Sequence, residues 1–207
     1  MMHPAIWDFW APRYERLYAQ TFALGPTRRM VLDHLDAVAP RAARILDLGC
    51  GIGQLAAELA GRRPAARITA IDPSPGMIER AGRDFARPGI TYLIGALDDL
   101  PQNESYDAIV STHAFPYLAD KPRALARLRG MLRPGGRLII VQGNTQNLYD
   151  RLFYLGIKLT VSKAEYLSTR ALAHLLTAAG FTLGAVTPLP RAWFIPSVYL
   201  VEGIVST

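Results

Sequence analysis

The chain has 207 residues, half of them hydrophobic and 19% charged. This balance fits a single globular domain with a full core and excludes an intrinsically disordered chain. The formal net charge of +6 permits an anionic substrate, an anionic membrane surface or nucleic acid. The basic residues come singly or in pairs rather than in runs, so we expect no nucleic-acid partner.

One cysteine, Cys50, is present. It can form neither an intrachain disulfide nor, by itself, a metal site, so we expect no metal. The N-terminal residues include Asp8 and Glu15 and lack a basic stretch followed by an apolar one, so no secretory signal is predicted. No apolar stretch approaches the ~18 residues of a membrane span. We therefore expect a cytoplasmic, reduced protein.

Two helices are predicted before residue 40. Apolar residues at helical spacing from Ile6 to Tyr18 indicate an amphipathic N-terminal helix that is interrupted near Pro12. A second helix is predicted from about Thr27 to Val38, and Pro40 closes it.

From residue 44 onward, short apolar runs alternate with helical patterns. The predicted strands are Arg44–Leu48, Arg67–Ile71, Thr91–Ile94, Ala108–Ser111 and Arg137–Val141. The predicted helices between them are Gln54–Ala60, Pro75–Phe85 and Lys121–Leu132. Strands separated by helices pair in parallel through right-handed crossovers, which predicts an open α/β sheet with helices on both faces. Ligands of such sheets bind beyond the carboxyl ends of the strands.

After residue 141 the pattern loosens over Asn144–Tyr166, an aromatic segment too long for a tight turn that we expect to cap a pocket. Ser168–Ala179 is predicted as a helix ended by Gly180, followed by a last pair of strands, Thr182–Thr187 and Tyr199–Ile204. We divide one domain, 1–207, into N-terminal helices (1–40), a core (44–141), a cap (142–166) and a final helix with C-terminal strands (167–207).

The most informative stretch is the turn from Asp47 to Gly53, which follows an apolar strand and precedes a helix. Glycines at 49, 51 and 53 let the backbone turn sharply and leave no Cβ between it and a ligand. Asp47 lies just before them, where a carboxylate can meet a cationic group. Asp72 ends the next strand, where an acid can accept hydrogen bonds from both hydroxyls of a ribose. Two such acids fit a ligand with a ribose and a positive charge.

Five pieces of this chain, in order, resemble class I S-adenosylmethionine-dependent methyltransferases, in the small-molecule branch with quinone and phospholipid-headgroup enzymes. They are Asp47–Gly53, Ile71–Met77, Gly95–Pro101, Tyr106–Ser111 and Leu132–Leu138. The resemblance implies a Rossmann-like fold with a seven-stranded, mostly parallel sheet, helices on both faces and an antiparallel last strand. It also implies S-adenosyl-L-methionine as cofactor and S-adenosyl-L-homocysteine as product.

Carried over by position, the resemblance implies that Gly49, Gly51 and Gly53 pass under the methionine part of the cofactor. Asp47 would then lie near the amino group and Asp72 would hold the ribose hydroxyls. Two neighbours in these turns join the predicted cofactor site: Cys50 and Pro73.

Near the adenine the resemblance is less complete. Met77 would lie against the ring, although a methionine packed in the core is an equal alternative. The family commonly has an acid immediately after Gly95, and here that place is Ala96. The adenine contact is therefore expected from the Leu97 backbone, from Asp98 or from water.

At the methionine end, Ser111 and Thr112 end the fourth strand and are expected to face the cofactor. Many relatives have a pair of histidines a few residues later, where this chain has Pro116-Tyr117. His113 is the candidate general base, because an ordinary histidine accepts a proton near neutrality. The alternative is a histidine that packs at the strand end with both nitrogens satisfied.

The spacing in Trp10-Ala11-Pro12-Arg13-Tyr14 is similar to the N-terminal helix that closes over the cofactor in these relatives. It implies a place for Tyr14 beside the cofactor carboxylate, and we predict it as a catalytic-site residue. Trp7 and Trp10 are instead expected to pack in the core.

The segments Asn144–Tyr166 and Leu189–Val201 combine aromatics and isoleucines with Arg151, Lys158 and Arg191. This suggests an apolar pocket with a basic rim, suited to a hydrophobic small molecule or lipid: a quinone-like, phenolic or phospholipid-headgroup acceptor. Such an acceptor can be approached from an anionic membrane surface. The alternative is an ordinary cap whose aromatics belong to the core.

Two other functions stay open from the sequence. Gly51–Ala56 also fits a dinucleotide pattern, which would indicate a nicotinamide-dependent oxidoreductase. Asp47 argues against it, because a carboxylate there would face the pyrophosphate. The altered positions Ala96 and Pro116-Tyr117 also allow a methyltransferase-like fold that serves only as a binding subunit.

Overall fold

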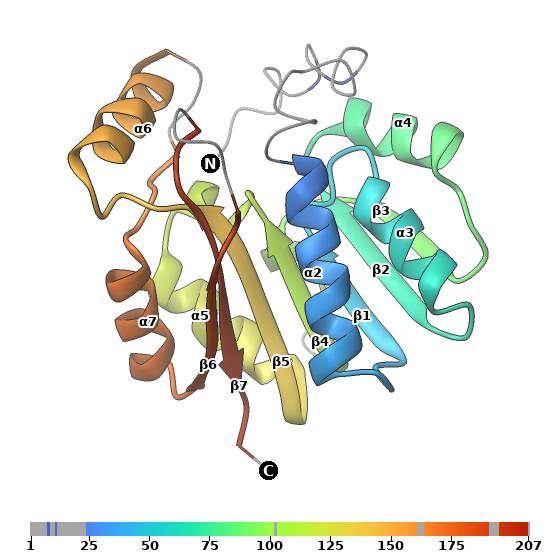
Figure 1. The fold of residues 1–207 in the computed structure, drawn as a ribbon. Helices are drawn as coiled ribbons and strands as arrows, with labels where there is room; N and C mark the ends of the chain where they lie inside the picture. The colour runs from blue at the N-terminus through green and yellow to red at the C-terminus, as the bar shows by residue number, and fades with distance from the viewer. Residues whose placement is uncertain are drawn as a thin grey trace.

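The computed structural model describes residues 8, 11, 24–101, 103–160, 164–190 and 195–206. This part of the chain forms one seven-stranded sheet in the order β3-β2-β1-β4-β5-β7-β6 (Figure 1). Six strands run in the same direction, and β7 is antiparallel to both of its neighbours. The strands are β1 Arg44–Leu48, β2 Arg67–Asp72, β3 Ile90–Ile94, β4 Tyr106–Thr112, β5 Leu132–Gly143, β6 Thr182–Pro188 and β7 Val198–Ile204.

The helices connect these strands and cover the sheet. They are α2 Gly25–Val38, α3 Gln54–Arg62, α4 Pro75–Asp84, α5 Lys121–Gly130, α6 Leu148–Thr160 and α7 Thr169–Ala178, with short 3-10 turns η3 Leu97–Asp99 and η4 Phe115–Tyr117. The expectation of an α/β sheet with an antiparallel last strand is confirmed. No helix in the described part of the chain is long and apolar enough to span a bilayer.

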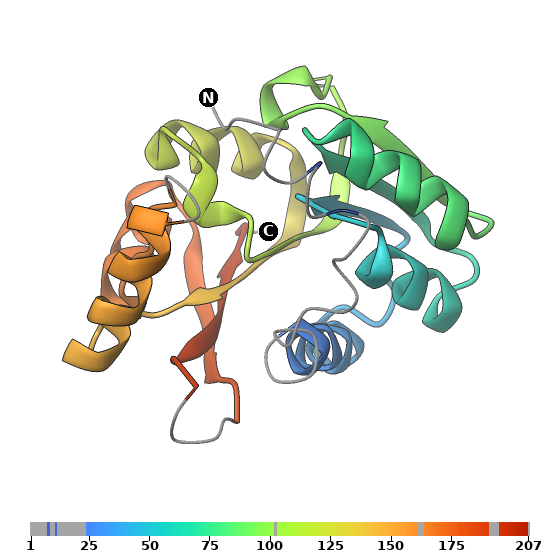
Figure 2. The same ribbon diagram turned by 90° about the horizontal axis from the view of Figure 1, so that it is seen from above.

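The helices form one layer on each face of the sheet, as Figure 2 shows from above. On one face, α2 and α3 bury side chains such as Leu32, Leu35 and Leu59 against β1, β2 and β4. On the other face, α5 and α7 bury Leu125 and Leu172 against β4, β5 and β7. This arrangement leaves the carboxyl ends of β1, β2 and β4 together at one edge, where the sequence places its candidate residues.

The predicted strands and helices of the core are confirmed, with differences at their ends. The helix predicted to end at Leu132 ends at Gly130, because Leu132 pairs with Tyr106 and begins β5. Strand β5 is long because it pairs with β4 on one side and with β7 on the other. Neither partner is visible in a local sequence pattern.

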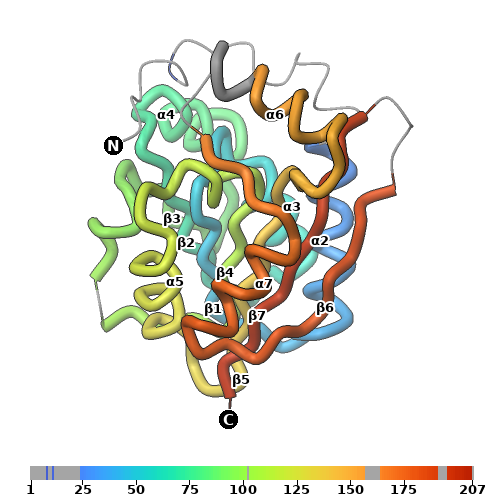
Figure 3. The backbone as a smooth tube through the Cα atoms, turned by 90° about the vertical axis from the view of Figure 1, so that its left-hand side faces the viewer, coloured from blue at the N-terminus to red at the C-terminus, as the bar shows by residue number. Residues whose placement is uncertain are grey.

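The segment Asn144–Tyr166, which we expect to cap a pocket, contains the helix α6. Five of its large apolar residues are exposed, namely Leu148, Tyr149, Leu152, Phe153 and Leu155, whereas Tyr154 is buried. An amphipathic helix is usually recognised by assuming that its apolar face is buried in the core. This assumption does not hold for the exposed apolar residues of α6. In Figure 3, α6 lies at the same end of the molecule as the start of α4.

Several predictions fall on residues outside the described part of the chain. These are the N-terminal helix interrupted near Pro12 with its residues Trp7, Trp10 and Tyr14, and the cation Arg191. The side chain of Lys158 also lies outside it.

Candidate functional site

The site is built around the turn that joins β1 to α3. Gly49, Gly51 and Gly53 all have positive φ angles, of 76°, 54° and 83°, which favour glycine. A Cβ on Gly49 would lie 2.2 Å from Cβ of Ala114, and one on Gly53 would lie 2.5 Å from the Tyr92 hydroxyl. A Cβ on Gly51 would meet nothing within 4 Å. The turn is therefore tight on both sides and open at its centre, as a ligand cradle requires.

Backbone hydrogen bonds tie this turn to the end of β2. The amides of Gly49 and Cys50 donate to the Ile71 carbonyl at 2.8 and 3.1 Å. The amide of Gly51 donates to Oδ2 of Asp72 at 3.0 Å, and the amide of Ser74 donates to Oδ1 at 2.9 Å. Asp72 is thus held in one orientation at the mouth of the turn, and each of its oxygens still has a lone pair available. Burial raises its pKa.

Asp47 is the least satisfied group of the site. Its side chain is fully buried, and neither carboxylate oxygen has a hydrogen-bond partner in the described structure. Burial, and to a lesser extent the charge of Asp72, raise its pKa to about 7. A buried carboxylate without a partner is costly. A cationic ligand group would remove that cost, so the carboxylate is suited to binding one.

A hollow of about 50 Å³ lies beside the turn, between α2, the start of α3 and the end of β4. Its polar lining comes from side chains that are far apart in sequence: Thr27, Arg28, Gln54, Thr112 and His113. Cys50 lines it as well, and burial raises the pKa of its thiol well above the usual range. The hollow therefore has hydrogen-bonding groups on one side and the open glycine turn on the other.

His113 lines this hollow in a strained conformation. It is the one residue other than glycine in the described chain with a positive φ, of 58°, a conformation that persists only where its surroundings impose it. Its amide donates to the Val141 carbonyl at 2.7 Å, and its Nε2 lies 3.1 Å from Oγ1 of Thr27. Burial lowers its pKa to about 4, so its imidazole is neutral at pH 7.

Arg28 is a site residue that the sequence reading missed. Its Nε donates to Oε1 of Glu58 at 2.9 Å and its Nη1 to Oε1 of Gln54 at 3.0 Å. These contacts hold the guanidinium at the start of α3, next to the glycine turn. The pair Arg28-Arg29 gave no signal in the sequence, because Gln54 and Glu58 lie on another helix and meet Arg28 only through the packing of α2 on α3.

Asp8 contacts the turn that joins β2 to α4. Its Oδ1 accepts hydrogen bonds from the Ser74 hydroxyl at 2.5 Å and from the Gly76 amide at 3.0 Å. Ser74 also caps α4 by accepting from the Met77 amide. Pro73 lies between Asp72 and this cap, so it belongs to the same wall of the site.

Among the residues predicted near the adenine, few turn toward the cradle. Met77 is buried with Ala11 and Ile52, and Leu97 belongs to the main core, so only its backbone could serve a ligand. The Asp98 carboxylate is paired with Arg123 of α5 at 3.3 Å. The amide of Ala96 donates to Asp99 at 2.8 Å.

Three residues at the ends of β4 and β3 differ in their surroundings. Thr112 lines the hollow and Ser111 does not, because successive residues of a strand point to opposite faces. Ser111 is buried, and its hydroxyl has no partner in the described structure. Ile94, at the end of β3 beside Asp72, is 60% exposed. Sequence reading missed it, since an isoleucine that ends a strand looks like core.

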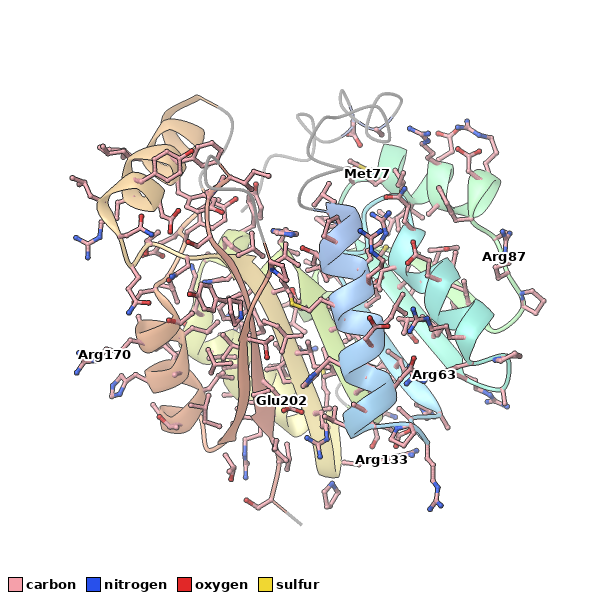
Figure 4. The ribbon with its side chains drawn as sticks, in the orientation of Figure 1. Arg63, Met77, Arg87, Arg133, Arg170 and Glu202 are labelled. Carbon is pink, nitrogen blue, oxygen red and sulfur yellow. The ribbon has the colours of Figure 1, made fainter. Side chains whose placement is uncertain are left out.

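In Figure 4, Met77 lies at the end of the molecule that carries the glycine turn, and Arg63 and Arg133 lie toward the opposite end.

The contacts described above bring together nine of the predicted site residues. They are Asp47, Gly49, Cys50, Gly51, Gly53, Asp72, Pro73, Thr112 and His113. The role of Tyr14 lies outside the described residues and stays a prediction.

Residues 46–140 match a family described as "Methyltransferase domain". An uncharacterized methyltransferase of Mycobacterium tuberculosis is 40% identical over 124 residues, which cover 58% of this chain and 61% of the relative. Trans-aconitate 2-methyltransferase of Deinococcus radiodurans is 38% identical over 121 residues, which cover 57% of this chain and 46% of the relative. The chain thus matches between about half and three fifths of these relatives' length.

Among solved structures, an N-methyltransferase of Bradyrhizobium japonicum in complex with S-adenosyl-L-homocysteine is similar to this chain, with a TM-score of 0.77. The two are 18% identical, and the match covers 97% of each chain. At this identity the likeness shows the fold.

Proposed function

We propose that this chain, whose residues 46–140 match a methyltransferase-domain family, is a class I S-adenosylmethionine-dependent methyltransferase that transfers the methyl group of S-adenosyl-L-methionine to a small-molecule acceptor. The observation that carries the proposal is the buried, unpartnered carboxylate of Asp47 beside the open centre of the glycine turn. This pairing fits a ligand that combines a cationic group with a body lying across the turn.

The residues present fit this cofactor. Asp47 would hold its ammonium group, and Asp72 would accept from both ribose hydroxyls through its free lone pairs. Arg28, fixed by Glu58 and Gln54 beside the turn, would pair with its carboxylate. Ile94, exposed next to Asp72, would offer an apolar surface to its adenine.

When bound, the cofactor supplies an activated methyl group, so the protein needs chiefly to position the acceptor and exclude water. We assign that positioning to Thr27, Thr112 and His113, which line the hollow at the methionine end. Because its pKa is about 4, His113 is neutral at pH 7 and is a weak base that can accept a hydrogen bond. Its low basicity suits an acceptor whose reacting atom needs no base to remove a proton.

The acceptor we propose is a hydrophobic small molecule or lipid of the quinone-like, phenolic or phospholipid-headgroup type. The support is the helix α6, which lies at the same end of the molecule as α4 (Figure 3) and exposes Leu148, Leu152 and Phe153. Side chains of this kind suit an apolar acceptor better than a polar one. Trans-aconitate, in the name of one relative, is also a small molecule.

The cofactor is tested by thermal unfolding with S-adenosyl-L-methionine, S-adenosyl-L-homocysteine or NADH. At about 100 times the dissociation constant, a bound ligand adds about 2.7 kcal/mol of stability, or about 5–10 °C for a chain of this size. We expect such a shift with the first two ligands. A shift with NADH alone would instead support a nicotinamide-dependent oxidoreductase and refute the proposal.

Catalysis is tested by a screen of quinols, phenols and phospholipid amines with a labelled methyl donor. Transfer to one of these acceptors supports the proposal. Cofactor binding without transfer to any acceptor would favour the alternative of a non-catalytic binding subunit.

We also propose peripheral contact between α6 and an anionic membrane, because an exposed apolar helix face on a chain of net charge +6 suits such a surface. Co-sedimentation with anionic phospholipid vesicles is expected, and Leu152→Ser should reduce it. Leu183→Ser, which alters an exposed apolar residue of β6, is the matched control. No binding to anionic vesicles, or equal binding by both variants, would refute the contact.

A further inference from the structure

A second, larger hollow lies at the opposite end of the sheet from Asp47 and Asp72. It has a volume of about 520 Å³ and is lined by residues at the amino ends of β1, β2, β3 and β4. Arg67 begins β2 and Asp72 ends it. Five residues of a strand span about 16 Å, so this groove is separate from the methyl-transfer site.

The groove exists because no α-helix of the described residues covers this part of the sheet. The helices that contact β2 and β3 most are α3 and α4, and both lie on the other face (Figure 1). The connection from β3 to β4 contains only the short turn η3 among its described residues. Thr69, Thr91 and Leu93 therefore face the groove rather than a helix.

One end of the groove carries two guanidinium groups. Arg44 and Arg67 are direct partners in the β1–β2 register, and both line the groove. Arg44 is paired with Glu104 and lies over the Tyr106 ring, 5.9 Å from its centre. The Arg67 side chain is exposed, and it has no hydrogen bond or ion pair with any residue that the structure describes.

Among the described residues, this pair carries one positive charge more than the acid paired with it balances. Like charges on facing residues of neighbouring strands repel each other, and Glu104 offsets only one of the two. An anion between the guanidinium groups would remove the repulsion and accept hydrogen bonds from Arg67. The rest of the lining is largely apolar, with Leu93, Leu100 and Pro101 beyond the arginines.

We infer that this groove is a second ligand site, for a small amphipathic carboxylate. The carboxylate group binds Arg67 beside Arg44, and the apolar body lies against Leu93 and Pro101, which line the groove and are not fully buried. The volume is within the range of small-molecule sites, about 300–1,000 Å³. This site takes no part in methyl transfer, so its test is independent of the test of the proposed function.

The test is calorimetric titration of the whole chain with decanoate, in the presence of saturating S-adenosyl-L-homocysteine. Acetate, which lacks the apolar body, and decanol, which lacks the charge, are the comparison ligands. We expect decanoate to bind at least about tenfold more tightly than either, since a charged hydrogen-bonded pair and the apolar contact both contribute.

Two variants locate the binding. Arg67→Gln should weaken decanoate binding about tenfold, and Thr91→Trp should abolish it by filling the groove. Arg87→Gln, which removes a charge from another exposed arginine (Figure 4), is the matched control and should bind normally. All three positions are exposed, and unchanged circular dichroism checks the fold.

Absence of decanoate binding to the wild-type chain would overturn the inference. So would equal affinity for decanol, which would indicate apolar contact alone, or undiminished binding by both Arg67→Gln and Thr91→Trp. None of these results would bear on the binding of S-adenosyl-L-methionine at the other end of the sheet.

Discussion

Replacing Asp47 by asparagine removes the charge of a fully buried carboxylate and keeps its shape. The wild-type pKa is raised from 3.8 to about 7 by burial and by Asp72. The folded protein therefore holds this proton more tightly than the unfolded chain does. The contribution of Asp47 to the free energy of unfolding is full below pH 4 and is lost as the pH rises to about 7.

The size of this loss follows from the pKa change. At about 1.4 kcal/mol per tenfold change in proton affinity, it amounts to about 4 kcal/mol between pH 4 and pH 8. The asparagine side chain has no proton to lose, so the difference in unfolding free energy between the wild type and Asp47→Asn should change by about this amount. Urea unfolding of the ligand-free proteins across this pH range measures it.

The same carboxylate predicts the pH dependence of cofactor binding. A cationic group on the ligand favours the ionised form, so wild-type affinity for S-adenosyl-L-methionine should rise by up to about tenfold per pH unit between pH 5 and pH 7. Asp47→Asn should bind about 100-fold more weakly at pH 7.5, from the loss of a charged hydrogen-bonded pair worth about 3 kcal/mol. Its affinity should vary little below pH 7.

Calorimetric titration at several pH values tests this, and Asp33→Asn is the control, because Asp33 is an exposed carboxylate of an ion pair with Arg62. The reasoning is refuted if Asp47→Asn keeps the wild-type pH dependence of affinity. It is also refuted if the free energies of unfolding of the wild type and of Asp47→Asn change in the same way with pH. Asp47 would then be ionised in the folded protein over the whole pH range.

Three further predictions concern the other walls of the site. Asp72→Ala should weaken S-adenosyl-L-methionine binding at least about tenfold, because the ribose loses its acceptor; an unchanged calorimetric affinity would place the ribose elsewhere. Gly53 has a φ of 83°, and an added Cβ would lie 2.5 Å from the Tyr92 hydroxyl, so Gly53→Ala should lower the free energy of unfolding by about 1–3 kcal/mol. Urea unfolding that matches the wild type would show that the turn relaxes. His113→Gln should lower kcat about 100-fold or more if the imidazole takes a proton in the reaction, with cofactor affinity within about threefold; equal losses in both would mean that His113 only holds the turn.

The core of the fold could be predicted because its signals are local. The run Ile45-Leu46 followed by Asp47 and three glycines places a strand end, an acid and a turn within a few residues. The same holds for Asp72 at the end of β2 and for Ser74 as the cap of α4. Each pattern reflects the conformational preference of the residues themselves.

Other features depend on partners far away in the chain. The extension of β5 back to Leu132 comes from pairing with Tyr106. The choice of Thr112 over Ser111 as a lining residue depends on the face that β4 turns to α2. Helix α6 was not predicted, and several of its apolar side chains are exposed, whereas the helical pattern assigns such side chains to a buried face.

The sequence alone determined the order of strands and turns and the identity of the two acids, since apolar periodicity and glycine placement act over neighbouring residues. Only the tertiary structure decided that Arg28, Thr27 and His113 meet at one hollow and that Arg44 and Arg67 share another. The physical reason is that strand register and helix packing, which bring such residues together, are set by the whole buried surface and not by any segment of it.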